Sequence, residues 1–371
     1  MPRKMKTRII IQAFGLLLTA LLSGALLGCI PNEPAVTDHK TNFEALWKIM
    51  DERYCFFEEK GVDWDAVHTK YAQLLEKGGK ISDLDFFNLM GEMLNELKDG
   101  HVNLISSFDV TMYSDWRGDP TEGLNIYARA KELPGVKLSS GGMAYQRYKF
   151  QDDEELSFGY ISYGSFSSSL GNLDNIFQFM EEADGLIIDV RGNGGGALDN
   201  STNLLSRFFD EKTLVGYMSH KTGPGHSDFS DPMALYVEPY EEEEYRWTEK
   251  PILVLQDRSC YSAANDFLTK IDLAGNVTRI GLKSGGGGGI PATQELPNGW
   301  VVRYSSVKNY DSTMKSVEEG IEPDVVISGV SYYADPSAPD IILRGAINHF
   351  FRLFHPDAPD PGSGEGGSDD N

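Results

Sequence analysis

The sequence predicts an α/β fold, in which a small lobe of helices precedes a layered core of strands and helices. Residues 42–99 show helical spacing of their apolar side chains, in three segments. From His101 onward, short apolar runs typical of buried strands alternate with amphipathic helices as far as residue 273. Because β-α-β-α alternation is the pattern of layered α/β cores, we assign residues 100–355 to one such domain.

The first residues indicate an export signal. Four basic residues precede an apolar run from residue 9 to residue 27, and the run ends in Leu26-Leu27-Gly28-Cys29. This ending resembles a bacterial lipobox, which implies that residues 1–28 are removed and that the Cys29 thiol is lipidated. An uncleaved transmembrane anchor is the alternative, because the run approaches spanning length. Either way, we expect a protein of the cell envelope that is held at a membrane, either periplasmic or exposed at the surface.

Charge and cysteine content exclude several classes of function. The formal charge is −23, and removing residues 1–28, with four basic and no acidic residues, gives −23 − 4 = −27. So acidic a chain is a poor nucleic-acid binder. Cys55 and Cys260 do not make a disulfide framework. No Cys/His spacing indicates a metal site, and we expect no cofactor.

The helical lobe is bounded by recognisable start and stop signals. Residues 29–41 read as a polar tether, and the lobe follows from residue 42. Its second helix begins after a candidate cap at Asp63, and its third begins at Ser82, with Asp85 at capping-box distance. Lys98-Asp99-Gly100 is a glycine C-cap signal that ends the third helix.

The core is read from its apolar runs and turn residues. Residues 356–371 are rich in Gly, Asp, Ser and Pro and are expected to be a disordered tail. Asn298-Gly299 predicts a hairpin between flanking strands. The other predicted strands are 102–105, 158–163, 186–190 and 252–255, and the predicted helices are 170–180, 198–208, 262–273 and 341–350.

Ser262 is the first candidate for chemistry. It lies where the buried strand 252–255 turns into the helix 262–273. At such a helix N-terminus, unpaired N–H groups and the helix dipole stabilise negative charge that develops on a nearby oxygen. An acyl-transfer nucleophile needs this setting. The alternative is that Ser262 only caps the helix, as serine often does.

Two further features suit a nucleophilic serine. His101 stands at the junction between a helix and a strand, where a side chain is held rigidly, although many such histidines are only packed or capping residues. The glycine-rich stretch 191–196 follows a buried strand, so that its backbone N–H groups can face a ligand. It lacks the features of a phosphate-binding loop. An oxyanion hole made by a Gly195-region N–H and the N–H of Ala263 fits better.

Four motifs in order resemble those of the tail-specific (C-terminal processing) serine peptidases and the related tricorn core protease. They are Lys-Asp-Gly-His at 98–101, Asp-Val-Arg-Gly-Asn-Gly-Gly-Gly at 189–196, Asp-Arg-Ser-Cys-Tyr-Ser-Ala-Ala-Asn-Asp at 257–266 and Glu-Gly-Ile-Glu-Pro-Asp at 319–324. The resemblance covers roughly residues 42–330. It implies a crotonase-like (ClpP/crotonase) layered core, with Ser262 as the nucleophile and Ala263 and the Gly195 region as oxyanion donors.

One departure selects between branches of this resemblance. The processing peptidases use a lysine 25 residues after the serine, a place held here by Gly287, and Lys283 is out of register. The tricorn-like branch instead uses a histidine, matched by His101, which a glutamate orients. That glutamate falls on Glu318 or Glu319, and the spacing does not choose between them. The branch also has a serine before the histidine, where this chain has Gly100.

Many family members also carry a PDZ domain between the His motif and the glycine-rich loop. Only residues 106–157 are available here, too few for it, so we expect no PDZ domain. We therefore predict a lipid-anchored serine peptidase that acts on peptides or unfolded proteins, with Ser262, His101 and one of the two glutamates as a triad. The alternatives are an inactive relative that binds a peptide or hydrophobic ligand, and a hydrolase of lipid or cell-wall esters. The sequence leaves the oligomeric state open.

Overall fold

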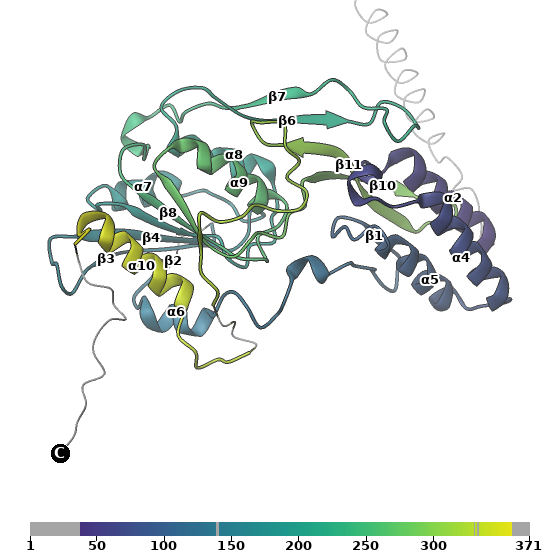
Figure 1. The fold of residues 1–371 in the computed structure, drawn as a ribbon, viewed down its shortest axis with the longest axis horizontal. Coiled ribbons are helices and arrows are strands. Elements are labelled where there is room, and N and C mark those ends of the chain that lie inside the picture. Colours follow the sequence, from purple (N-terminus) through teal and green to yellow (C-terminus); the bar gives the residue numbers. More distant parts are fainter. Residues whose placement is uncertain (1–37, 139–140, 330, 332–333, 358–371) are drawn as a thin grey trace, which may run out of the picture.

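The computed structural model describes residues 38–138, 141–329, 331 and 334–357. The predicted export signal, Cys29 and the tail from residue 358 lie outside the described residues. Within the described part the molecule is elongated, with helices α2, α4 and α5 at one end and the layered core at the other (Figure 1). None of the helices in these ranges has both the length and the apolar character that crossing a bilayer requires.

The helical lobe forms as its caps predict. The Asp63 carboxylate accepts a hydrogen bond from the Ala66 N–H, and the Ser82 hydroxyl accepts one from the Asp85 N–H, which confirms both predicted caps. The predicted stop at Gly100 is wrong, because the third helix ends earlier and the residue with positive φ is Lys98. The lobe helices are α2 (His39–Arg53), α3 (Phe57–Lys60), α4 (Trp64–Gly78) and α5 (Asp83–Asn95).

A central sheet of seven strands forms the core, in the order β12-β9-β8-β5-β4-β3-β2. Neighbours from β12 to β4 are parallel, whereas β3 and β2 add antiparallel pairs at one edge. The strands are β2 (Lys137–Leu138), β3 (Met143–Lys149), β4 (Ser157–Tyr163), β5 (Leu186–Asp189), β8 (Ile252–Gln256), β9 (Val277–Gly281) and β12 (Val325–Val326).

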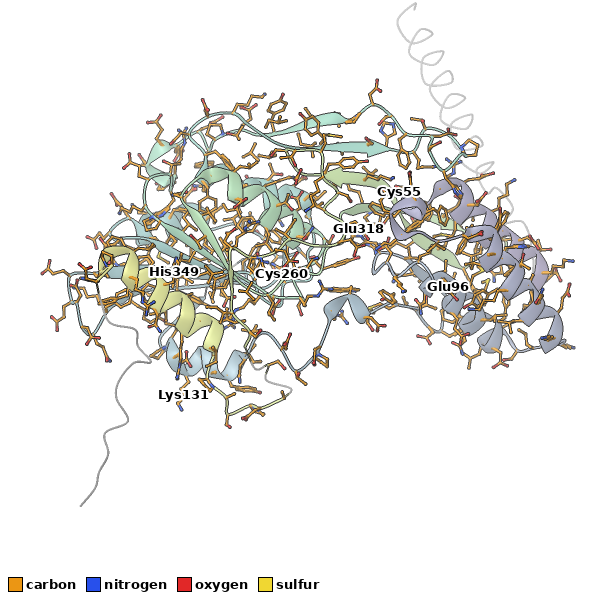
Figure 2. The ribbon with its side chains drawn as sticks, in the orientation of Figure 1. Cys55, Glu96, Lys131, Cys260, Glu318 and His349 are labelled. Carbon is orange, nitrogen blue, oxygen red and sulfur yellow. The ribbon has the colours of Figure 1, made fainter. Side chains whose placement is uncertain are left out.

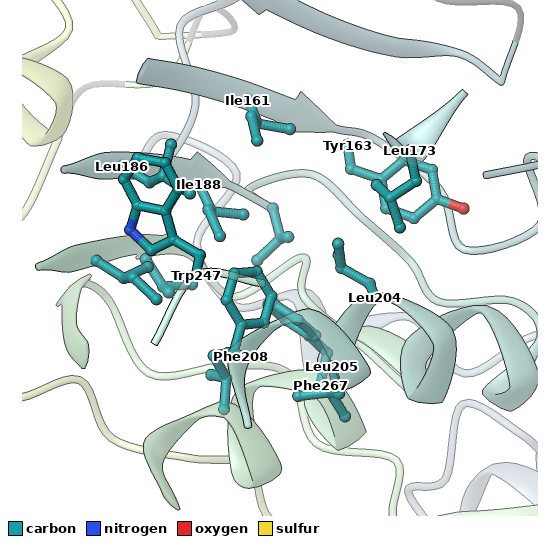
Figure 3. Packing of buried hydrophobic residues seen from close by; sticks show 14 of the residues in the cluster. Ile161, Tyr163, Leu173, Leu186, Ile188, Leu204, Leu205, Phe208, Trp247 and Phe267 are labelled. Carbon is teal, nitrogen blue, oxygen red and sulfur yellow. The ribbon is translucent and has the colours of Figure 1, made fainter. Parts of the chain in front are cut away.

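Helices cover both faces of this sheet, as Figure 1 shows. Helices α7, α8 and α9 pack on one face around a cluster that includes Ile188, Leu205 and Phe267 (Figure 3). Helices α6 and α10 lie on the other face, where Ile342 and Phe350 pack against the strands. The bounds are α6 (Ile126–Glu132), α7 (Leu173–Met180), α8 (Leu198–Leu205), α9 (Ala263–Ile271) and α10 (Ile341–Phe354), with 3-10 turns η1 (Asp115–Arg117), η2 (Ser206–Phe208), η3 (Glu243–Tyr245) and η4 (Asp272–Ala274).

A second sheet joins the lobe to the core. Its long strand, β11, pairs with β1 and β6 along one edge and with β10 along the other. The predicted hairpin at Asn298-Gly299 is confirmed, because it connects β10 to β11. Leu296, Val302 and Tyr304 of this hairpin are buried in the same cluster as the lobe helices. The strands are β1 (Asn103–Ile105), β6 (Thr213–His220), β7 (Met233–Val237), β10 (Gly289–Glu295) and β11 (Val301–Tyr310).

Side chains from both parts meet at this boundary. In Figure 2, Cys55 and Glu96 lie in the lobe, Cys260 lies inside the core, and Glu318 lies between the two. Cys55 and Cys260 are separate, buried free thiols. Glu318, one of the two candidate glutamates, therefore lies where the lobe meets the core.

Candidate active site

The backbone at Ser262 has an unusual conformation. Its φ of 57° and ψ of −120° place this serine in a region that residues with a side chain rarely occupy. Its N–H donates to the Gly286 carbonyl at 2.9 Å, which helps to fix the turn between β8 and α9. The hydroxyl makes no capping hydrogen bond, so the reading of Ser262 as a simple helix cap is not supported.

The glycine-rich loop after β5 packs directly against this turn. A Cβ added to Gly195, whose φ is +96°, would come within 2.8 Å of Ser262 Cβ and 2.9 Å of the Ala263 nitrogen. The Gly195 N–H donates a hydrogen bond to Asn193 Oδ1 at 2.9 Å, so an oxyanion donor of the expected Gly195 region would have to be another N–H of this loop. Among the described residues the N–H groups of Ala263 and Gly196 have no hydrogen-bond acceptor.

A buried ion network fixes the start of the same loop. Arg191 lies between Asp189 and Asp340, with Nε 2.9 Å from Asp189 Oδ1 and Nη1 2.7 Å from Asp340 Oδ1. All three side chains are almost fully buried. Because breaking such a pair would leave a buried charge without a partner, the network holds the loop in place relative to α10.

The pentaglycine 285–289 is held by backbone hydrogen bonds next to the serine. Gly285 donates to the Cys260 carbonyl at 2.8 Å, and Gly287 donates to the Glu318 carbonyl at 3.0 Å. At Gly287, where a processing peptidase would have its lysine, an added Cβ would overlap the Tyr261 ring. Lys283 instead forms an ion pair with Glu322 at 3.2 Å.

A pocket of about 370 Å³ opens at Ser262. Its wall combines the glycine-rich loop, the start of α9, the pentaglycine and β11. Gly196, Asn265, Ile290 and Arg303 are among its lining residues. The pocket therefore leaves Ser262 and the N-terminus of α9 accessible to a ligand.

His101 lies in the buried layer behind Tyr261. The centroids of the two rings are 4.9 Å apart, and Arg303 Nη1 donates to the His101 carbonyl at 3.1 Å. Burial lowers the pKa of His101 to about 4, which Asp99 opposes and Arg303 and Lys60 reinforce. The imidazole is therefore neutral at pH 7. Its Nδ1 is buried without a hydrogen-bond partner, and no hydrogen bond joins the ring to Ser262 Oγ.

The two candidate glutamates differ in their surroundings. The Glu318 side chain is 3% exposed, and its Oε1 lies 2.8 Å from Lys60 Nζ, while its Oε2 is buried without a partner. The Glu319 side chain is 76% exposed, and its Oε1 lies 3.4 Å from the same nitrogen. Burial and the neighbouring Asp99 raise the pKa of Glu318 to about 8, against the opposing effect of Lys60.

Asp99 connects these groups, although sequence reasoning gave it no role. One of its oxygens accepts from the His101 N–H at 2.7 Å and from the Tyr261 hydroxyl at 3.3 Å. The other accepts from the Ser305 hydroxyl at 2.8 Å and the Tyr54 hydroxyl at 3.1 Å. Asp99 stands two residues before His101 in the sequence, and this spacing was the local signal that its carboxylate could bind the His101 backbone N–H.

The comparisons with known proteins match two regions of the chain. Peptidase family S41 matches residues 157–327, and the tricorn protease C1 domain matches residues 35–95. The carboxyl-terminal-processing protease of Synechocystis sp. is 26% identical over 202 residues, which are 52% of this chain and 43% of that protein. The carboxy-terminal processing protease CtpA of Bacillus subtilis is 24% identical over 180 residues, 47% and 36% of the two chains. This chain thus spans less than half the length of these curated relatives.

Solved structures share the fold over most of the chain. A "putative peptidase" from Parabacteroides merdae is 39% identical, with a TM-score of 0.76 and coverage of 85% of this chain and 97% of that one. Mature CPAF is 12% identical with a TM-score of 0.64 and coverage of 86% and 99%, a likeness of fold alone. The expected α/β core with an N-terminal helical region is confirmed, and the chain belongs to peptidase family S41, a family of serine hydrolases, with a tricorn C1-like region at its N-terminal side.

Proposed function

We propose that this chain is an exported, lipid-anchored serine peptidase that cleaves peptide bonds through an acyl-enzyme on Ser262. The observation that carries the proposal is the backbone of Ser262. Its positive-φ conformation presents a hydroxyl that makes no capping hydrogen bond to a pocket, beside the N–H of Ala263, which has no acceptor in the part of the chain that the structure describes. The parallel strand order and the helices on both faces support a crotonase-like core.

The steps follow from the chemistry of the three side chains. Ser262 Oγ attacks the scissile carbonyl carbon while its proton passes to His101. The oxyanion that forms is stabilised by the N–H of Ala263 and by a second N–H from the glycine-rich loop, which we assign to Gly196 because Gly195 donates elsewhere. His101 then protonates the leaving amine as the C–N bond breaks. Water, deprotonated by His101, cleaves the ester, and the proton returns to Ser262.

We assign the orienting carboxylate to Glu318 rather than Glu319. Glu318 is buried beside the same Lys60 and Asp99 that influence His101, and it has a free oxygen. A carboxylate there can hold one tautomer of the imidazole and stabilise its protonated form. The imidazole ring of His101 is not hydrogen-bonded to Ser262 Oγ or to Glu318 in this structure, and catalytic hydrogen bonds in enzymes often tighten only when substrate binds.

A fluorophosphonate probe tests the nucleophile. We expect it to label the wild-type protein at Ser262, and we expect Ser262→Ala to abolish both labelling and peptide turnover. Ser259 is a half-buried serine three residues earlier in the same turn, and Ser259→Ala is the matched control. This variant should keep both the labelling by the probe and the peptide turnover. An unlabelled wild-type protein would favour the ligand-binding alternative. Hydrolysis of esters but not of peptides would favour the esterase.

The substrate is proposed to be a peptide or an unfolded protein, cleaved internally or near its carboxyl terminus. The names of the Synechocystis and Bacillus relatives describe carboxyl-terminal processing, which supports this class of substrate. Product mass spectrometry on unstructured peptides with free and amidated C-termini would separate the two modes. Equal cleavage of both forms at internal bonds would contradict carboxyl-terminal processing.

The membrane tether rests on the sequence before the described residues. Cys29 in Leu26-Leu27-Gly28-Cys29 is the proposed lipid attachment site. Cys29→Ser should lose labelling by a fatty-acid analogue and leave the membrane fraction, whereas Cys55→Ala, at a buried thiol, should stay lipidated. Unchanged lipid labelling of Cys29→Ser would exclude this site.

A further inference from the structure

Lys60 is a buried lysine that the proposed mechanism does not yet use. It ends helix α3, and its side chain is only 11% exposed. Its Nζ lies 2.8 Å from Glu318 Oε1, with longer contacts of 3.4 Å to Glu319 Oε1 and to the Lys98 carbonyl. The short contact joins the helical lobe to the core across 258 positions of sequence.

In the part of the chain that the structure describes, two buried atoms of side chains influenced by Lys60 lack a hydrogen-bond partner. Glu318 Oε2 is an acceptor, and His101 Nδ1 is a donor in one tautomer of the ring. Unpaired polar atoms are uncommon in protein interiors, and each one calls for an explanation. Lys60 and Asp99 each affect the pKa of both His101 and Glu318, so the two side chains lie near the same pair of charged groups.

The charged and titratable groups that face Glu318 come from both parts of the molecule. They are Tyr54, Cys55 and Lys60 of the lobe, Asp99 at its end, and Tyr261 and Glu319 of the core. Among these six groups Lys60 alone is a cation. Without it, Glu318 would keep its proton to still higher pH, because burial and the neighbouring negative charge of Asp99 both disfavour the ionised form.

We propose that Lys60 is a positioning residue, which binds Glu318 Oε1 and favours the ionised carboxylate, so that Oε2 is left to accept a hydrogen bond from His101 Nδ1. This inference rests on the proposed triad. It gives the helical lobe a part in the chemistry, because the cation that favours the ionised form of the orienting carboxylate comes from α3. A protonated Glu318 would stabilise the imidazolium poorly.

A purely structural ion pair is the alternative, and the chain offers a matched example. Glu59, the residue before Lys60, pairs with Lys308 of β11 at 2.5 Å across the same boundary, with side-chain exposures of 28% and 7%. Among the described residues, neither member of this pair forms an ion pair or a side-chain hydrogen bond with Glu318 or His101. Lys308→Met therefore measures the cost of losing a buried ion pair between lobe and core without touching the proposed triad.

The first experiment compares kcat/KM against pH for the wild type, Lys60→Met, Lys60→Arg and Lys308→Met. We expect the acid limb of Lys60→Met to move to higher pH, with a loss of about tenfold at pH 7 for each unit of added pKa on Glu318. Lys60→Arg, which keeps the charge, should restore the wild-type profile. Lys308→Met should keep that profile even if its stability falls. An unshifted acid limb in folded Lys60→Met would overturn the proposal.

A second experiment does not depend on catalysis. Protein labelled with ¹³C at glutamate carboxyl carbons is titrated by NMR, and the Glu318 signal is identified by its loss in Glu318→Gln. We expect Lys60→Met to raise the pKa of Glu318 and Lys308→Met to leave it unchanged. If Lys60→Met does not fold, Lys60→Gln replaces it. An unchanged Glu318 titration refutes the part played by Lys60, whereas turnover that survives Ser262→Ala refutes the proposed function.

Discussion

Burial sets the character of each side chain in the candidate site. Ser262 is held in a strained turn, His101 is neutral because it is desolvated, and the pKa of Glu318 is raised because its carboxyl is buried beside another acid. Each of these conditions is costly for the fold. Their concentration within one cluster is typical of catalytic sites, where perturbed groups are retained for function.

The turn at Ser262 should store strain that glycine relieves. With a φ of 57°, a side chain at this position costs about 1–3 kcal/mol. We expect Ser262→Gly to be more stable than Ser262→Ala by about 1 kcal/mol in urea unfolding, although both lack the nucleophile. At Thr269, inside helix α9, we expect the reverse order, with Thr269→Ala more stable than Thr269→Gly, because glycine is the poorer helix former. Equal stability of the two Ser262 variants would exclude strain at this residue.

His101 should make stability depend on pH. Its pKa is about 4 in the folded protein and near the ordinary 6.5 in the unfolded chain, so between these values the unfolded state binds more protons. The contribution of roughly 3 kcal/mol is complete above pH 6.5 and is lost as the pH falls to 4. Urea unfolding of His101→Gln across this window should show a shallower dependence on pH. The same slope in both proteins would contradict the buried, neutral histidine.

Local motifs could predict only part of this residue-scale arrangement. Ser262 and His101 stood out because each lies at a junction between a strand and a helix. The choice between Glu318 and Glu319 needed burial, which adjacent positions in a loop do not reveal. Lys60 had no signal, because its partner is 258 positions away and a lysine at a helix end is ordinarily solvated.

At the scale of elements, two glycine-rich loops shape the turn after β8. The loop that follows β5 packs against the serine turn, and the pentaglycine accepts the Ser262 N–H. Glycine allows this close approach of backbone to backbone, since a Cβ would collide. The sequence identified both loops. Their approach to the turn after β8 depends on the parallel pairing of β5 with β8.

Neighbouring glycines of the first loop should differ sharply in their tolerance of a side chain. An added Cβ at Gly195 would lie 2.5 Å from the Tyr261 carbonyl, and its φ of +96° also disfavours alanine. At Gly194 nothing lies within 4 Å. We expect Gly195→Ala to lose most turnover and to lower the melting temperature, while Gly194→Ala stays close to wild type in both. Comparable activity of the two variants would contradict this packing.

Helices and buried strands were predicted better than the outer strands. The capped helices α4 and α5 and the core strands β4, β5 and β8 carry periodic apolar side chains that mark them. Strands β6 and β7 were missed, because most of their residues are not fully buried and the partner strand β11 lies elsewhere in the chain. The strand β4 alternates in sequence yet is buried along its whole length, since helices cover both faces of its sheet.

At the scale of the whole molecule, the lobe and the core share a boundary that the sequence divides at residue 99. Leu296, Val302 and Tyr304 lie after that division in the chain but are buried against the lobe helices. The cluster around Asp99 crosses the same boundary through Tyr54 and Ser305. The helical lobe therefore covers part of the β10–β11 hairpin, and it also contains Lys60.

A fragment that starts at residue 100 should consequently fail to fold. Removing the lobe exposes Leu296, Val302 and Tyr304, which are at most 5% exposed in the full chain, at a cost of about 1.5–3 kcal/mol each. We expect such a fragment to be inactive, to bind a hydrophobic dye and to lack near-UV circular dichroism. In the full chain, Leu46→Ala within the lobe should remain folded but lose about 2–5 kcal/mol, whereas Leu84→Ala, at a side chain 52% exposed, should be nearly neutral. A soluble, active fragment would show that the core needs neither the cover nor the cation that the lobe provides.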